Sequence, residues 1–120
     1  MDIGKKIWVI AEGFIPSWSN APQLTSHETA CILNATDKDA SVEITIYFAN
    51  KEPTGPYRFI VPARRSKHLM YKDLKYPKPI PADTSYSSVI VSDVPVVVQH
   101  TRVDSKQTEN TLLTAIAYAE

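Results

Sequence analysis

The chain has 120 residues, of which 43% are apolar and 22% charged, and its 13 basic and 13 acidic side chains give a formal charge of zero. This length suits one domain, residues 1–120, with one core, and the composition is that of a folded protein rather than a disordered one. Neutrality argues against nucleic acid as a partner, because such binding usually rests on net neutralisation of phosphates.

The N-terminal segment and the cysteine content both indicate an intracellular chain. The longest apolar runs span only a few residues, whereas a helix that crosses a bilayer needs about 20. Lys5 and Lys6 precede a run that is broken at Glu12, so the pattern of a signal peptide is missing. The single Cys31 allows no internal disulfide, which suits a reducing compartment. We therefore expect a cytoplasmic location and a Cys31 packed in the core.

Three strands are predicted in the first part of the chain. Ile7–Phe14 is the first, and Val42–Phe48 is the clearest, because every second residue there is apolar and either β-branched or aromatic. A polar turn at 34–39 separates Val42–Phe48 from a strand at Glu28–Asn34. These last two strands are expected to be the arms of a hairpin.

Proline and glycine positions divide the rest of the chain. Two prolines and a glycine in 50–56 exclude a helix and predict a second hairpin, in which Tyr57–Val61 pairs with the strand before it. Alternate prolines in 75–81 predict an extended crossover. Pro95 cannot lie inside a hydrogen-bonded ladder, so we place it at a strand start or a bulge, in a turn at 92–95. The remaining predicted strands are Ser66–Tyr71, Ser87–Ser92, Val96–Val103 and Leu112–Ala119.

Eight short strands separated by frequent turns, without a long amphipathic helix, are typical of an antiparallel β-sandwich or barrel. Two segments, Val96–Val98 and Leu112–Ala119, are apolar on both faces. They should lie centrally, or one should be covered by another subunit, because exposed two-sided apolar strands risk edge pairing and aggregation. The pattern therefore favours a homo-oligomer.

The sequence contains no motif for catalysis or for a cofactor. With only three glycines, neither a dinucleotide-binding fingerprint nor a phosphate-binding P-loop can be assembled. The nucleophile-elbow pattern of hydrolases is also absent. We therefore expect a protein that binds a partner rather than an enzyme, with no catalytic residue and no cofactor.

The three histidines, His27, His68 and His100, lie on three different predicted strands, so a three-histidine zinc site is geometrically conceivable. No two of them share a close ligand spacing, however, and no metal ligand is assigned. Strand alternation puts His100 and Arg102 on one face of their strand, and Arg64 and His68 on one face of theirs. These side chains either converge in a polar ligand pocket or are scattered and individually satisfied.

The two tryptophans differ in context. Trp8 lies inside an apolar strand and is expected in the core. Trp18 lies in a predicted loop next to Pro16, where an aromatic ring can stack on a sugar or contact a partner protein.

The charges are unevenly distributed although they balance overall. The segment 57–78 has seven basic side chains and one acidic one, Asp73. Such asymmetry either marks a surface that meets an acidic partner or belongs to a solvated face whose charges are matched by acidic neighbours. The candidates for partner contact are Trp18, Arg58, Arg65 and Lys67.

Six segments form an ordered set along the chain: Ala11–Pro16, Ser26–Asn34, Ala40–Phe48, Gly55–Arg58, Val61–Arg65 and Ser92–Arg102. In this order and spacing they resemble the sensory rhodopsin transducer family, and the resemblance runs over about residues 7–119. It implies a protomer that is a single antiparallel β-sandwich of about eight strands, hence an all-β fold, and a homotetramer.

The resemblance also implies a function. For the family member that gave the name, the role is to relay a light signal from a seven-helix retinal receptor at the cytoplasmic face of the membrane. This favours a non-enzymatic signalling adaptor, with a small-ligand module, for example one that binds a carbohydrate, as the alternative. The positions that match the polar motif residues of the family are Glu12, His27, Glu28, Arg64, Arg65, His68, His100 and Arg102.

Overall fold

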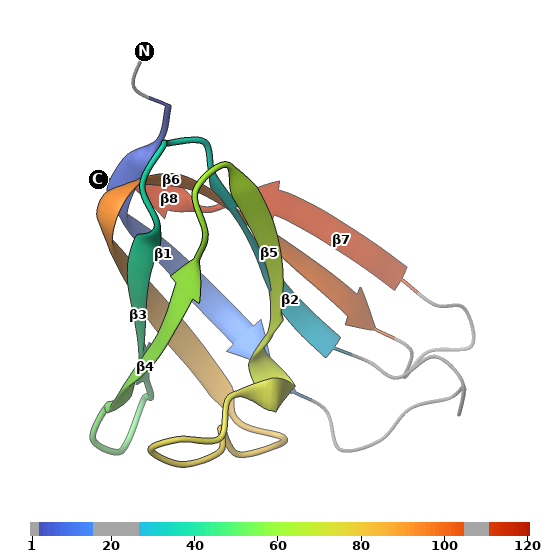
Figure 1. Ribbon diagram of the computed structural model, residues 1–120. Coiled ribbons are helices and arrows are strands. Elements are labelled where there is room, and N and C mark those ends of the chain that lie inside the picture. Colours follow the sequence, from blue (N-terminus) through green and yellow to red (C-terminus); the bar gives the residue numbers. More distant parts are fainter. Residues whose placement is uncertain (1–2, 16–26, 105–110) are drawn as a thin grey trace.

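A computed structural model describes residues 3–15, 27–104 and 111–120 of the chain, and these are the residues discussed below (Figure 1). Within these ranges there are eight strands and one short 3₁₀ helix, η1 (Tyr71–Asp73). No helix in the described ranges is long and apolar enough to cross a membrane. The strands are β1 (Lys5–Phe14), β2 (His27–Asn34), β3 (Ala40–Tyr47), β4 (Thr54–Val61), β5 (Arg65–Met70), β6 (Ser85–Asp104), β7 (Thr111–Ile116) and β8 (Tyr118–Ala119).

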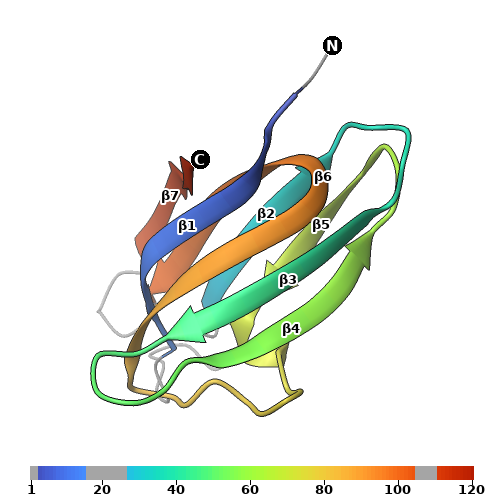
Figure 2. The same ribbon diagram turned by 90° about the vertical axis from the view of Figure 1, so that its left-hand side faces the viewer.

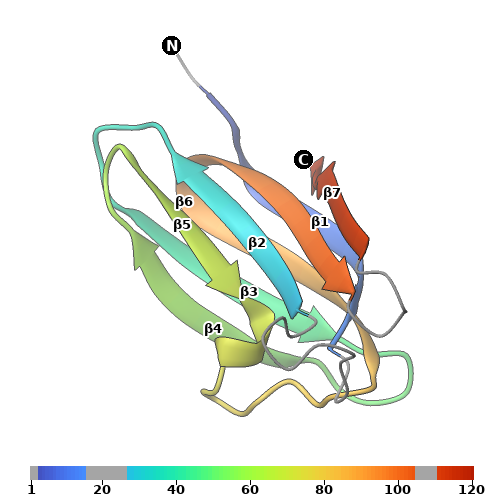
Figure 3. The same cartoon turned by 90° about the vertical axis from the view of Figure 1, so that its right-hand side faces the viewer.

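The strands form two layers that face each other, as two views at right angles to Figure 1 show (Figures 2 and 3). The first sheet has the order β4-β3-β6-β1-β8. In the second sheet β5 pairs with β2, β2 with β6, and β6 with β7. All of these pairs are antiparallel. The predicted all-β sandwich is confirmed.

Strand β6 takes part in both sheets. Its first half pairs with β1 and β3 up to Ser92, and Val96 pairs once more with Lys5 of β1. From Val97 onward β6 pairs with β2, and from Gln99 also with β7. The predicted pair of strands on either side of a turn at 92–95 is therefore wrong, because one strand of 20 residues runs through both regions. Pro95 has no register partner and lies in an irregularity of the β1–β6 ladder. Val91 and Val96 are five positions apart on β6, but their partners on β1, Ile7 and Lys5, are only two positions apart. Pro95 occupies a bulge, as predicted, because it has no N–H to donate to a ladder.

The connections between strands differ from the predicted hairpins at two places. The β3–β4 hairpin is confirmed. The predicted hairpin of β2 and β3 is wrong, because β2 pairs with β5 and β6, so that residues 35–39 cross from one sheet to the other. The predicted strand Leu112–Ala119 is divided at Ala117 into β7 in the second sheet and β8 in the first. In each case strand alternation predicts a buried face but not the sheet to which the strand belongs.

The core lies between the inner faces of the two sheets. On β3 the residues Val42, Ile44 and Ile46 are buried and alternate with exposed or half-buried neighbours, as the sequence pattern predicts. Trp8 is also buried, and its Nε1 donates to the carbonyl oxygens of Lys5 and Val96, each at 3.0 Å. Trp8 is therefore a core residue, and its indole N–H connects β1 with the bend of β6.

A buried asparagine joins the two sheets at the end where β2 stops. The Nδ2 of Asn34 donates to the carbonyl oxygens of Lys38, Val61 and Pro62 at 2.7, 3.0 and 3.3 Å. Its Oδ1 accepts hydrogen bonds from the backbone N–H and the hydroxyl of Thr36. Asn34 is fully buried, so every one of these bonds replaces a contact with water that the folded chain has lost.

We predict that Asn34→Asp lowers the free energy of unfolding by about 3 kcal/mol at neutral pH, because a buried carboxylate would then face carbonyl oxygens that have lost their donor. Urea denaturation followed by circular dichroism measures the change. Asp37→Asn in the same loop is the matched control: Asp37 is exposed, and its 3.7 Å ion pair with Arg64 contributes little. Equal effects of the two substitutions would contradict the prediction.

Candidate functional site

Among the described residues, the most buried acidic side chain lies at the start of β2. Glu28 is 1% exposed and belongs to the inner row of its strand. Its carboxylate accepts a hydrogen bond from the backbone N–H of Phe14 on β1 and lies 2.5 Å from Nε2 of His100 on β6. Because β1 belongs to the first sheet and β2 to the second, Glu28 bridges the two layers. Charge-assisted hydrogen bonds of this kind are what make a buried carboxylate tolerable.

Two tyrosines lie near Glu28. The hydroxyl of Tyr71 is 2.8 Å from Oγ of Ser88, and the rings of Tyr71 and Tyr86 are 5.4 Å apart between centroids. Burial raises the pKa of both phenols, and the negative charge of Glu28 raises each further. The hydrogen bond from Ser88 opposes this increase in the pKa of Tyr71, and the positive charge of Arg102 opposes it in the pKa of Tyr86. Both tyrosines are therefore neutral at physiological pH.

The hydroxyl of Tyr86 is a buried polar group without a hydrogen-bond partner, the only such side chain in the described part of the protein. A glycine gives its ring room: a Cβ at Gly13 would lie 2.4 Å from Cε1 of Tyr86. An isolated glycine inside a strand pattern often marks such a close approach. This is the signal in the sequence for the Tyr86 position, although neither Tyr71 nor Tyr86 was predicted as part of a site.

We call Glu28, Tyr71, Tyr86, Ser88 and His100 the inner polar cluster. Of the predicted ligand-binding residues, the structure brings Glu28, His100 and Arg102 together. Arg102 lies directly opposite Glu28 in the β2–β6 register and is half-buried. The cluster connects the two sheets by hydrogen bonds. The carboxylate of Glu28 accepts one from the backbone N–H of Phe14 and forms another with the imidazole of His100.

Other predicted ligand residues lie elsewhere. Glu12 is exposed on β1. Arg64 is not part of β5 but lies in the turn before it, with φ of 54°, near the Asn34 end of β2. Six residues of extended strand separate Glu28 from Asn34, so Arg64 is about 20 Å from the inner polar cluster.

The histidines do not share a face. His68 is exposed and pairs with Cys31, on the outer face of the second sheet, whereas His100 pairs with Ala30 on the inner face. The Cα of His27 is opposite that of Val103, and its side chain lies outside the described residues. Among the residues that are described, no group of three or more His, Cys, Asp or Glu side chains is placed to hold a metal ion. Cys31 is half-buried rather than packed in the core as expected.

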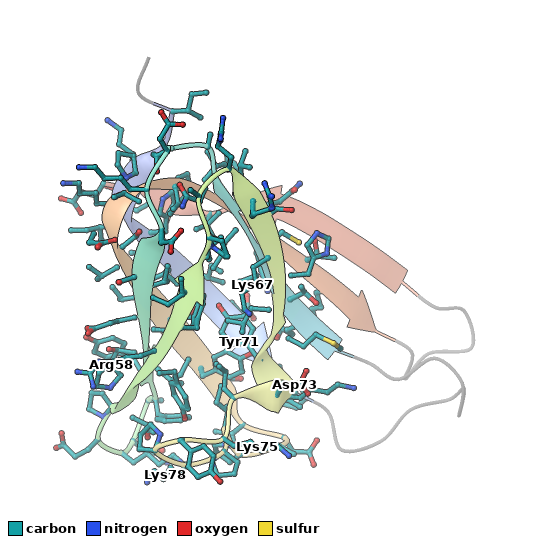
Figure 4. The ribbon with its side chains drawn as sticks, in the orientation of Figure 1. Arg58, Lys67, Tyr71, Asp73, Lys75 and Lys78 are labelled. Atoms are coloured by element: carbon teal, nitrogen blue, oxygen red, sulfur yellow. The ribbon has the colours of Figure 1, made fainter. Side chains whose placement is uncertain are left out.

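The basic residues of segment 57–78 follow the side of the sandwich formed by the edge strands β4 and β5 and by the crossover after η1 (Figure 4). Arg58 forms a 2.9 Å ion pair with Glu43, and both side chains are largely exposed. Lys67 lies over the ring of Phe59, 5.8 Å from its centroid. Five of these basic side chains form no ion pair with a described carboxylate: Arg65, Lys67, Lys72, Lys75 and Lys78.

We call Arg58, Arg64, Arg65 and Lys67 the basic surface. Of these four residues, only Arg58 and Arg64 form ion pairs with described acidic side chains. A solvated face whose charges are matched by acidic neighbours, one of the two interpretations of the sequence, therefore accounts for only part of the segment. The fourth predicted contact residue, Trp18, lies outside the described residues.

Comparisons with known proteins identify relatives over nearly the whole chain. The family model described as "Anabaena sensory rhodopsin transducer" matches residues 3–119. A solved structure titled "Anabaena sensory rhodopsin transducer" is 60% identical, with a TM-score of 0.77, over 84% of this chain and 100% of that one. A second, titled "Crystal Structure of Thermotoga maritima 1070", is 34% identical, with a TM-score of 0.85, over 98% of this chain and 96% of that one. A search of curated proteins gave no match.

The two buried tyrosines are expected to respond differently to loss of the hydroxyl. Tyr86→Phe should leave the free energy of unfolding unchanged or raise it by up to about 1 kcal/mol, because the hydroxyl that is removed has no partner. Tyr71→Phe should lower it by about 1 kcal/mol, because Ser88 loses its partner. Urea denaturation of the matched pair measures both. A clear destabilisation by Tyr86→Phe would show that this hydroxyl is hydrogen-bonded in solution.

Proposed function

The chain belongs to the sensory rhodopsin transducer family, and on that premise we propose that it is a non-enzymatic cytoplasmic signalling adaptor that binds a receptor. The observation that carries the proposal is the 60% identity, over the full length of that protein, to a structure named as a transducer of a sensory rhodopsin. The partner of such a transducer is a membrane receptor, so the surface that this chain would use faces the cytoplasmic side of a membrane protein.

The basic surface is the part of the chain that we assign to receptor contact. Its three arginines are exposed on β4, in the turn after it and at the start of β5, and Lys67 on β5 is half-buried. Arg65 and Lys67 have no described carboxylate with which to pair. Cations that are not neutralised within their own fold are available to a partner and increase the rate at which an acidic surface associates. Guanidinium groups also bind carboxylates in a two-point geometry, which favours Arg64 and Arg65 as the specific contacts.

The small-ligand module is the weaker candidate. It requires the polar motif residues to face one cavity, whereas Glu12, Arg64 and His68 lie on different parts of the surface. Glu28 and His100 already satisfy each other. The signalling role therefore has the stronger support.

We also propose that the chain assembles as a homotetramer. On the outer face of the first sheet, Ile7 and Val91 are register partners and are 40% and 43% exposed. Tyr118 is 65% exposed, beside Val9 on the same sheet. A contiguous apolar patch of this kind on a soluble protein is typical of a protein–protein interface. A second copy of the chain is the occupant that we propose, because Tyr118 belongs to Leu112–Ala119, one of the two segments that are apolar on both faces.

Charge reversal of the basic surface should weaken receptor binding. We expect Arg64→Glu/Arg65→Glu to reduce the affinity for a sensory rhodopsin in nanodiscs by about tenfold, because two favourable surface contacts become repulsive. Biolayer interferometry measures the affinity, and thermal unfolding checks that the fold is kept. Lys75→Glu/Lys78→Glu, at the other end of the molecule, is the matched control. Unchanged capture by the first variant, or an equal loss in the control, would overturn this assignment.

The assembly is tested by substituting the apolar face. Val91→Lys should reduce the mass measured by light scattering below that of the wild-type tetramer, because a lysine would be desolvated in the contact. Leu33→Lys, at a site that is also 43% exposed but on the second sheet, should leave the mass unchanged. A wild-type monomer, or dissociation by Leu33→Lys alone, would contradict the proposal.

A further inference from the structure

A groove of about 440 Å³ lies at the end of the sandwich opposite Arg64 and Arg65. One wall is the β3–β4 turn, and the other is the proline-rich crossover that follows η1. Figure 4 shows Lys75 and Lys78 on this crossover, at the lower end of the molecule. The volume is within the range of about 300–1,000 Å³ that is usual for ligand sites. The lining residues are Lys51, Glu52, Pro53, Thr54, Gly55, Pro77 and Lys78.

The walls of this crossover groove are held in place by the core beneath them. Tyr57 on β4 is buried, and its hydroxyl donates a hydrogen bond to the carbonyl oxygen of Lys78. On the other wall, the ammonium of Lys51 lies 4.5 Å from the ring centroid of Phe48. The groove is thus formed before anything binds, and a preformed site avoids the entropy cost of ordering its own walls.

The groove lining carries two lysines against one carboxylate, Glu52, and an aromatic residue lies at its rim. Lys51 and Lys78 stand on opposite walls, and neither forms an ion pair with a carboxylate in the ranges that the structure describes. Lys75 adds a third cation on the crossover. Tyr76, next to the lining residue Pro77, is 86% exposed. A fully exposed tyrosine beside rigid prolines is the type of residue that dominates protein–protein contacts.

We propose that the crossover groove docks an extended acidic segment of a partner protein. The lysines on the two walls complement carboxylates on either side of such a segment, while Tyr76 and the prolines contact its apolar atoms. Nucleic acid fits less well, because a single exposed aromatic ring does not form a stacking platform and the chain has no net positive charge. The inference goes beyond the proposed function, since this groove lies at the end of β4 away from Arg64 and Arg65.

The test uses the full chain and a fluorescein-labelled polyglutamate peptide with a central tyrosine–proline pair, with binding followed by fluorescence anisotropy. We expect wild-type binding that weakens as salt is added. Lys51→Glu/Lys78→Glu should weaken it by about tenfold, whereas Lys51→Arg/Lys78→Arg should keep the affinity within about twofold. Lys5→Glu/Lys6→Glu, at two exposed positions at the start of β1, is the matched control for net charge and should also stay within about twofold.

Three outcomes would overturn the proposal: no binding of the peptide to the wild-type chain, equal binding by wild type and Lys51→Glu/Lys78→Glu, or an equal loss in Lys5→Glu/Lys6→Glu. A labelled oligothymidylate that binds more tightly than the peptide and depends on the same two lysines would assign the groove to nucleic acid instead. Receptor capture does not enter this measurement. Failure of the adaptor proposal and failure of the groove are therefore separate results.

Discussion

Both sheets of the sandwich are hydrogen-bonded to one strand, β6, which passes from the first layer to the second at Pro95. A strand that serves two sheets must break its ladder where it changes partners, and a residue without an N–H is suited to that point. The core forms inside the bend, with Val96 and Val98 fully buried and Trp8 hydrogen-bonded to the carbonyl of Val96. The positions of β1, β2 and β3 all follow from this single path.

Strand β2 connects the layers at both of its ends through a buried polar side chain. Asn34 satisfies its amide completely, which is the usual requirement for a polar group in a core. Glu28 is satisfied as well, but the hydroxyl of Tyr86 close to it is not. The two ends therefore differ: one is a saturated structural junction, and the other retains unused hydrogen-bonding capacity beside a buried charge. Such unsatisfied groups concentrate at functional sites more often than in ordinary cores.

The proposed contact surfaces are separated along β4. The basic surface extends from Arg58 in the middle of β4 through the turn after this strand and along β5, and the crossover groove lies at the turn where β4 starts. Six of the seven cations that are close together in the sequence are thus distributed over these two regions, and Arg64 and Arg65 are about the length of a strand from the groove. An adaptor with two such surfaces can hold one partner at each end while the rigid sandwich keeps a constant distance between them. The proposed contact between copies of the chain uses a third region, the apolar outer face of the first sheet.

The sequence by itself determined the all-β class, the strand faces, the core position of Trp8 and the bulge at Pro95, because alternation and proline chemistry act over a few neighbouring residues. The six resembling segments also identified the family. Only the tertiary structure decided that β2 pairs with β6 rather than β3, and that His68 and His100 lie on opposite faces. It likewise decided that Tyr86 lies against Gly13. Strand alternation has a period of two and carries no information about which sheet a strand joins, so the pairing that brings distant residues together depends on the packing of the whole core.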